Sequence, residues 1–337
     1  MLDSLSRRVL IAAAAVSFAA GCSGNALTPG GQSSVTPNAH QVGGGFRILP
    51  GPVVSGPIVV PLVAPRMNAP FGWPDKKKKH KEMLFVADSS GVLIYNPKKA
   101  NSGPIGSITT GTSSPFGVAL DKKGNLYVAN IGNSTVTVYP KGKNSPSLTI
   151  STGISSPYSI AVDSKADIFV SNLGDNNITA YKSGSGSPYE TISFGAYGQA
   201  VGIGLDASDN LWVACDSTNQ VFEIKAGSTG VTSAGLVNLG GPIGISFGQK
   251  DQFFVSNFSL SDVDVFDYGT TSAKYTIGNG IEKYGPTQNG LDTGDELFQT
   301  NQSDNVVGYK KGADTPFSTL TGATSAAQIV GWPLVKK

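Results

Sequence analysis

Several residue types are scarce in this sequence of 337 residues. It has two histidines, two cysteines and 14% charged residues, and its last arginine is Arg66. A typical globular domain carries about 25% charged residues. Because Cys22 and Cys215 are the only cysteines, a disulfide-stapled scaffold is excluded. The low charge also argues against coiled coils and long surface helices, which are built from Ala, Glu, Lys, Leu and Arg.

Glycine and proline are abundant instead, with 43 and 20 residues. Both interrupt helices, and the glycines follow no three-residue period, so a collagen-like helix is excluded. The hydrophobic fraction of 39% is sufficient for a sizeable core. These numbers favour many short strands joined by turns, in one large domain or two small ones.

The N-terminus has the pattern of an export signal. Arg7 and Arg8 precede an apolar run, residues 10–20, that is too short for a permanent membrane span. The run ends in Ala19-Ala20-Gly21-Cys22, which resembles the lipobox of bacterial lipoproteins. The resemblance implies a signal peptide at 1–21, a diacylglycerol on Cys22 and a location in the cell envelope, exposed to the periplasm or the cell surface. An ordinary cleaved signal is the alternative, and residues 6–10 also resemble a twin-arginine export signal.

Residues 22–81 are predicted to be a tether. Nine prolines and eight glycines lie among the 47 residues from Pro29 to Asp75, and they interrupt every apolar run. The apolar stretch 53–60 could alternatively dock on the folded domain. The basic run Lys76–Lys81 either is solvated or binds anionic lipid.

Residues 82–337 carry 16 lysines and no arginine against 21 Asp and Glu. A net negative domain without arginine is a poor candidate for binding nucleic acid. It also has no bidentate arginine clamp for a phosphate or carboxylate substrate. The remaining cysteine, Cys215, follows the apolar residues 211–214, so we expect it to be buried rather than reactive.

A repeat organises residues 82–337. Segments such as Leu126-Tyr127-Val128-Ala129-Asn130 recur with an aromatic residue three positions before the end. The final positions are Asp88, Asn130, Asn172, Cys215, Asn257 and Asn301, at spacings of 42, 42, 43, 42 and 44. Each copy predicts four strands: an apolar strand such as 115–120, a turn opening with Asp, the aromatic strand, an alternating strand and a weaker fourth.

Four antiparallel strands in about 42 residues predict one propeller blade, so six copies predict an all-β six-bladed propeller over 82–337. The first copy lacks its leading strand, and residues 328–332 can supply it. We therefore expect the C-terminal strand to join the first blade and close the ring. The segments 115–121 and 126–130 resemble NHL-type six-bladed propellers and, more loosely, SMP-30/gluconolactonase-like ones.

Polar residues at the ends of the second strands are predicted to gather on one face. They form a candidate ligand-facing ring: Asp88, Asn130, Asn172, Asp216, Asn257 and Asn301. The alternative is that each side chain caps a turn. Residues after the proline, or its counterpart, that opens a blade form a candidate mouth: Phe116, Tyr158, Val201, Ile243 and Thr287. Their alternative role is packing between blades.

The sequence indicates no catalytic residues, no metal site and no cofactor. The two histidines, His40 and His80, lie in the tether, whereas the lyases and paraoxonase-like hydrolases of similar fold rely on histidine. The resemblance to SMP-30-like lactonases implies Asn or Asp ligands at the mouth positions, which hold none. Asp262 and Asp264 share one strand face without a calcium-type loop, so a solvated face is the simpler interpretation.

These observations predict a lipid-anchored envelope propeller that acts as a non-enzymatic binding module. Its partners would be the membrane, through the lipid, and a protein, peptide or glycan; we expect a monomer and no nucleic acid. One alternative is a lactonase-like hydrolase or lyase with an unrecognised, metal-assisted site. Another is a scaffold subunit of an envelope complex.

Overall fold

The structure, a computed structural model, describes residues 82–248, 252–283, 285–302 and 305–332. The predicted signal peptide, the tether, Cys22 and both histidines lie outside these residues. No helix in the described part of the chain is long and apolar enough to cross a membrane.

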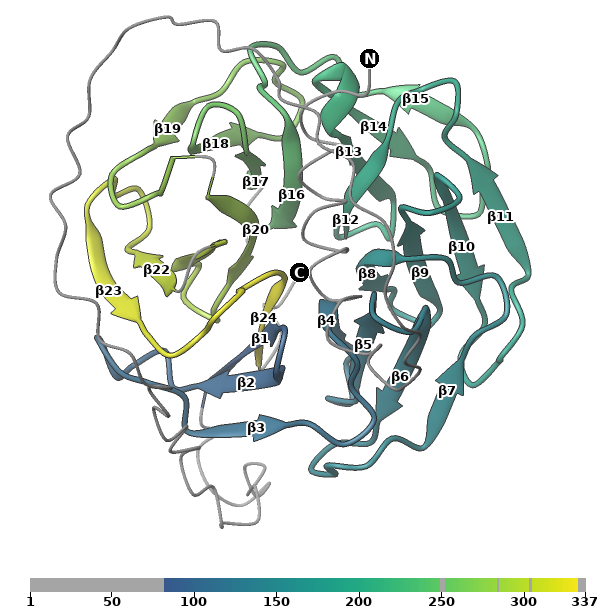
Figure 1. Ribbon diagram of the computed structural model, residues 1–337. Coiled ribbons are helices and arrows are strands. Elements are labelled where there is room, and N and C mark those ends of the chain that lie inside the picture. Colours follow the sequence, from purple (N-terminus) through teal and green to yellow (C-terminus); the bar gives the residue numbers. More distant parts are fainter. Residues whose placement is uncertain (1–81, 249–251, 284, 303–304, 333–337) are drawn as a thin grey trace, which may run out of the picture.

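Six four-stranded antiparallel sheets surround a central axis, so the all-β six-bladed propeller predicted from the sequence is confirmed (Figure 1). From its inner to its outer strand, blade 1 has β24 (Ile329–Trp332), β1 (Met83–Asp88), β2 (Gly91–Tyr95) and β3 (Gly106–Ile108). In the same order, blade 2 has β4 (Pro115–Leu120), β5 (Leu126–Asn130), β6 (Thr135–Tyr139) and β7 (Leu148–Ile150). Blade 3 has β8 (Pro157–Val162), β9 (Ile168–Asn172), β10 (Asn177–Tyr181) and β11 (Glu190–Ser193).

The other three blades repeat this order. Blade 4 has β12 (Ala200–Leu205), β13 (Leu211–Cys215), β14 (Gln220–Ile224) and β15 (Val231–Ser233). Its second and third strands are joined through a short 3-10 helix, η1 (Asp216–Thr218). Blade 5 has β16 (Pro242–Phe247), β17 (Gln252–Asn257), β18 (Asp262–Asp267) and β19 (Tyr275–Ile277). Blade 6 has β20 (Pro286–Leu291), β21 (Leu297–Asn301), β22 (Asn305–Tyr309) and β23 (Pro316–Leu320).

The C-terminal strand closes the ring as predicted. β24 pairs antiparallel with β1, with Phe85 opposite Val330 and Val86 opposite Ile329. The Asp88 carboxylate reinforces this closure, because it accepts hydrogen bonds from the backbone N–H groups of Thr324 (2.7 Å) and Ser325 (2.9 Å). Two segments more than 230 residues apart are thereby joined, and the sheet of blade 1 is complete.

Each pair of neighbouring blades shares one hydrophobic cluster, so the core is six interfaces rather than one centre. Between blades 2 and 3, for example, Ala119 and Tyr127 pack against Ile160 and Val170. Glycine permits the inner strands to approach each other closely. A Cβ on Gly202 would lie 2.2 Å from the Ile243 carbonyl oxygen, so no other residue fits there without a shift.

The two ends of the ring differ in their connections. We call the end that carries the turns between inner and second strands the hairpin face. The crossover face carries the turns between second and third strands and the loops that cross to the next blade. On the hairpin face an aspartate locks each of four turns: Asp121, Asp163, Asp206 and Asp292 each accept two backbone N–H groups from their own turn. This matches the Asp that the sequence pattern places first in the turn.

Candidate functional site

The candidate ring residues lie at the crossover face, at the ends of the second strands. Asn130, Asn172 and Asn257 are buried, and each Oδ1 accepts a backbone N–H from the loop that crosses from the preceding blade. The donors are Ser113 (3.0 Å), Ser155 (3.0 Å) and Gly240 (3.2 Å), respectively. Asn301 is also buried and accepts a longer bond from the N–H of Glu282 (3.5 Å).

The amide nitrogens of these residues point toward the third strand of the same blade. Asn130 donates to Thr137 Oγ1 (3.0 Å), Asn172 to Thr179 Oγ1 (2.9 Å) and Asn257 to Asp264 Oδ2 (2.8 Å). In blade 6, Asn301 donates to Asn305 Oδ1 (2.8 Å). Each amide therefore clamps the crossover loop to its own blade. The geometry favours the alternative that these side chains hold turns and loops; a role in ligand binding stays a prediction.

Blade 4 breaks the ring. Cys215, not Asp216, occupies the position of the clamping amides, because it stands opposite Ala200 as Asn130 stands opposite Pro115. Its crossover loop is held instead by Ser217, whose Oγ accepts the Gln199 N–H (2.9 Å). Cys215 is buried as expected, and burial together with the neighbouring Asp216 raises its pKa to about 12. The thiol is therefore protonated at neutral pH.

Four of the five candidate mouth residues meet on the axis at the crossover face. Phe116, Tyr158, Val201 and Ile243 pack with Leu173 and Phe258, and the rings of Phe116 and Tyr158 have centroids 4.3 Å apart. All of these except Phe116 and Leu173 are buried. Burial, with a contribution from Asp216, raises the pKa of Tyr158. We call this cluster the axial plug; it matches interblade packing more closely than an open mouth.

The fifth mouth residue, Thr287, is buried next to the plug in blade 6. Its hydroxyl bonds to Thr300 Oγ1 (2.7 Å) and reaches the carbonyl oxygens of Ala326 (3.1 Å) and Ala327 (3.1 Å). These two carbonyls lie just before β24. Thr287 therefore connects blade 6 to the segment that closes the ring.

The hairpin face opens into a cavity of about 630 Å³ along the axis, which we call the funnel. Its wall contains five aliphatic residues at one level of the inner strands: Val118, Ile160, Ile203, Ile245 and Ile329. At the next level towards the hairpin face the inner strands carry small residues: Ala119, Ala161, Gly204, Ser246 and Gly290. Because these side chains are short, they leave the axis open.

Gln328 lies at the inner end of the funnel, between the wall and the axial plug. Its Oε1 accepts the backbone N–H groups of Val118 (3.0 Å) and Ile160 (3.3 Å), and its Nε2 donates to the Ile160 carbonyl (3.3 Å). These N–H groups lie on the free inner edges of β4 and β8, where no strand pairs with them. One glutamine from the closing segment therefore covers the edges of two blades.

The funnel was not predicted from the sequence. Its rim holds Lys122, Asp163 and Asp209, and no other ionisable side chain lines the part of it that the structure describes. The available signal was the small residue in the fifth position of the inner strands, which recurs in blades 2 to 6. A pattern search for polar residues overlooks it.

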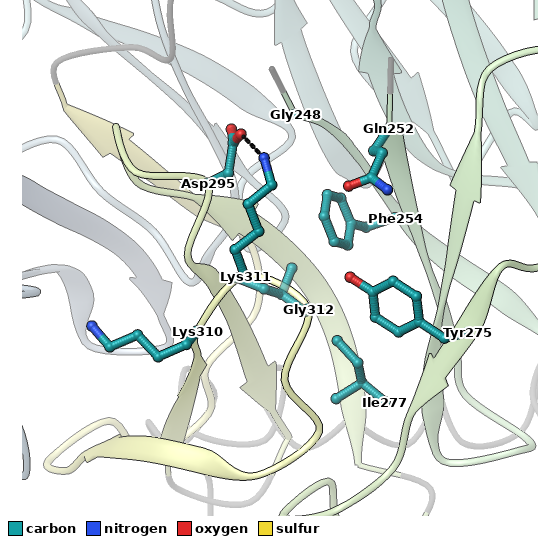
Figure 2. Close-up of a pocket in the computed structure, with 10 residues that line it drawn as sticks. Gly248, Gln252, Phe254, Tyr275, Ile277, Asp295, Lys310, Lys311 and Gly312 are labelled. Carbon is teal, nitrogen blue, oxygen red and sulfur yellow. Dashed lines mark hydrogen bonds and ion pairs between the residues drawn. The ribbon is translucent and has the colours of Figure 1, made fainter. Parts of the chain in front are cut away.

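Smaller hollows lie between the outer parts of neighbouring blades. Figure 2 shows the one between blades 5 and 6, where Phe254, Tyr275 and Ile277 face Lys311, whose Nζ is 2.7 Å from Asp295 Oδ2. Its volume of about 10 Å³ suits one water molecule. A hollow of about 320 Å³ lies between blades 3 and 4.

Within the described residues, no group of three or more His, Cys, Asp and Glu side chains is arranged to hold a metal ion. The Asp262 and Asp264 carboxylates, which share a strand face, are bridged by the Asn257 amide. Burial raises the pKa of Asp262.

Comparison with known proteins supports the fold. No protein-family model matches this chain, and no curated protein matches its sequence. A chain from the crystal structure of a nidogen–laminin complex has a TM-score of 0.64 and 17% identity, covering 76% of this chain and all of that one. A streptogramin B lyase structure has a TM-score of 0.50 and 12% identity, covering 70% and 73%. At these identities the similarity shows the propeller fold alone.

Proposed function

We propose that this protein is a lipid-anchored envelope propeller that binds a partner molecule without transforming it, and that the funnel is its binding site. The single observation that carries the proposal is the character of the funnel. It is a concave, mainly aliphatic cavity of about 630 Å³ with a few polar groups, which is the usual composition of a ligand site.

The chemistry of the lining supports binding over catalysis. General acid–base or nucleophilic catalysis needs a titratable side chain within hydrogen-bond reach of the reacting group. Among the described lining residues, Lys122, Asp163 and Asp209 are the titratable ones, and all three lie in turns at the rim. The Asp163 and Asp209 carboxylates accept backbone N–H groups of turns in blade 3, so both have structural roles.

A photocrosslinking experiment tests this proposal. A photoreactive amino acid replaces Lys122 at the funnel rim, and in a matched variant it replaces the exposed Ser151 in a crossover loop. After irradiation of native membranes, we expect mass-shifted adducts at position 122 and not at 151. Adducts confined to position 151 would contradict the funnel as the site. If the molecule identified in the adduct is chemically converted when it is incubated with the unmodified protein, the hydrolase or lyase alternative is favoured.

The envelope location is a part of the proposal that rests on the sequence. The lipobox-like segment ending at Cys22 supports a lipid anchor, and the proline-rich segment 22–81 supports a tether to an NHL-type propeller. Replacing Cys22 by Ser removes the thiol that a lipid would modify. We expect the Cys22→Ser protein to leave the membrane fraction, whereas a variant that keeps its membrane association would contradict the anchor.

A further inference from the structure

The funnel also carries information about the chemical class of its ligand. Resting on the proposed function, we propose that the funnel binds an uncharged small molecule with an apolar body and one hydrogen-bonding group. Asn289, Ser246 and Gln328 receive that group at the inner end. Three observations carry the argument: the size of the cavity, the charge of its lining and one break in its symmetry.

The size indicates a small molecule. Ligand pockets for small molecules have volumes of about 300–1,000 Å³, and the funnel, with about 630 Å³, lies in this range. Leu120, Leu205, Phe247 and Leu291 line it, and somewhat more than half of the lining surface is apolar.

The charge of the lining indicates an uncharged ligand. No Lys, Arg, Asp, Glu or His side chain lines the described part of the funnel below the rim. A ligand charge placed there would lose its hydration without gaining a counter-ion, which is costly. The described rim carries Lys122 against Asp163 and Asp209, a net charge of −1, and these charges lie outside the aliphatic part of the funnel.

The break in symmetry indicates the hydrogen-bonding group. Where five inner strands carry Val or Ile, β20 carries Asn289. Its Nδ2 donates to Ser256 Oγ (2.7 Å), and its Oδ1 accepts a hydrogen bond from Ser246 Oγ. An amide has two N–H groups and two carbonyl lone pairs, so one of each remains available.

Two further polar side chains are Ser246, which bonds to Asn289, and Gln328, which bonds to the inner edges of blades 2 and 3. Both line the funnel, and the Gln328 amide nitrogen has one donated bond, to the Ile160 carbonyl (3.3 Å). Its second N–H is therefore available as well. A ligand carbonyl, hydroxyl or amide can exchange hydrogen bonds with these side chains, and the aliphatic wall then covers its body.

An alternative is that the hydrogen bonds of Asn289 serve only to hold blades 5 and 6 together. The experiment must separate this structural role from ligand binding. Ser256 also donates to Gln299 Oε1 (2.7 Å), so the Asn289 amide ties blade 5 to blade 6. If this were its entire role, removing a polar group would change stability but not the ranking of ligands by head group. The decisive readout is therefore the preference among head groups.

Three water-soluble probes share one ring and differ in charge: cyclohexanecarboxamide, cyclohexanecarboxylate and cyclohexylmethylammonium. The full-length protein in detergent is titrated with each by calorimetry, with the detergent-only titration subtracted. We expect the carboxamide to bind at least about tenfold more tightly than either ion. Equal or tighter binding of either ion would overturn the proposal.

Two variants test whether Ser246 and Asn289 bind the carboxamide group. We expect Ser246→Ala and Asn289→Ile each to weaken carboxamide binding about tenfold, the equivalent of one hydrogen bond of about 1.4 kcal/mol. Binding of the two ions should not change. Ser151→Ala, on the crossover face, is the matched control and should leave every affinity unchanged. If Asn289→Ile does not fold, Ser246→Ala carries the test alone.

Wild-type affinity for the carboxamide in the folded variants would overturn the proposal, because Ser246 and Asn289 would then not recognise a ligand. Crosslinking at position 122 does not depend on this result. If adducts form at position 122 but the probes bind without a preference among head groups, the funnel remains the binding site. Only the proposed chemical class of the ligand would then be wrong.

Discussion

The crossover face and the hairpin face are built from the same six repeats, but their polar groups do different things. On the crossover face the buried amides of Asn130, Asn172 and Asn257 use both ends of the side chain to hold loops, and the axial plug packs residues of four inner strands together. On the hairpin face four turns are locked by their own aspartates, and the axis is open. The ring of polar residues seen in the sequence therefore holds the crossover loops in place. The small residues of the inner strands line the open funnel.

Charge separates the faces as well. Every described lysine except Lys283 lies in a turn of the hairpin face or in a connection between a third and an outer strand. Several pair with carboxylates there, such as Lys182 with Asp167 (2.8 Å) and Lys311 with Asp295 (2.7 Å). The crossover loops are rich in Ser, Thr, Asn and Gly instead. A partner would therefore meet most of the lysines around the funnel, whereas the ionisable residues at the other end are mainly acidic, such as Asp175 and Glu282.

The largest effect is expected from removing the segment that supports both faces. A chain ending at Ser325 lacks β24, which completes blade 1, and Gln328, which covers the inner edges of β4 and β8. We expect no cooperative thermal unfolding transition, whereas a control chain ending at Trp332 should keep one. A soluble, cooperatively folded chain ending at Ser325 would show that closure by β24 is dispensable.

The crossover face should be sensitive to loss of one clamp. Asn172→Ala leaves the Ser155 N–H and the Thr179 hydroxyl without their buried partner. We expect the free energy of unfolding to fall by about 2–3 kcal/mol, measured by urea denaturation. The exposed Asn144 provides the control, and Asn144→Ala should change it by less than about 0.5 kcal/mol. If both substitutions lower the free energy of unfolding equally, Asn172 stabilises the fold no more than an exposed surface residue does.

Close approach of the inner strands should be the next most sensitive feature. Gly202→Ala places a Cβ 2.2 Å from the Ile243 carbonyl oxygen, so the inner strands of blades 4 and 5 must separate. We expect a loss of about 1–3 kcal/mol in the same denaturation assay. Gly186→Ala is the matched control, because its Cβ would meet nothing within 4 Å. A neutral Gly202→Ala would mean that the axis is looser than the structure shows.

The last prediction concerns burial rather than stability. Burial raises the pKa of Cys215 from 9.0 to about 12, so the folded protein holds the thiol proton more tightly than the unfolded chain. In the Cys22→Ser background we expect iodoacetamide to alkylate Cys215 at pH 8 far more slowly in native protein than in urea. Equal rates would place this thiol at the surface.

The same shift in pKa has a consequence for stability. Because the folded pKa of Cys215 is raised, its contribution is fully present below pH 9 and declines as the pH rises through about 12. In the Cys22→Ser background, unfolding free energies measured at pH 8 and pH 10 should therefore differ more when Cys215 is present than in Cys215→Ala.

The fold was predictable because its signals are local and repeated. An aromatic strand such as 126–130 recurs six times, four of them after an Asp-initiated turn, and predicts each blade separately. Even the missing inner strand of the first blade could be located, since residues 328–332 were left over. The structure places that strand at Ile329–Trp332.

The site was less predictable because its contacts are not local. The sequence identified Asn130 and Asn172 as polar positions, but their partners Ser113 and Ser155 lie 17 residues earlier, in the crossover loops that lead into the same blades. The funnel cannot be recognised within any one repeat, because its small residues come from the inner strands of different blades. Asn289 stands out only when those strands are aligned around the axis.

The most direct test of this account is a crystal structure of the full-length protein with cyclohexanecarboxamide bound. We expect the ring of the probe to lie against Ile203 and Ile245 and its amide to lie between Asn289 and Gln328. Density for the probe at the crossover face instead, near Phe116 or Asn130, with an empty funnel would contradict the assignment of binding to the hairpin face.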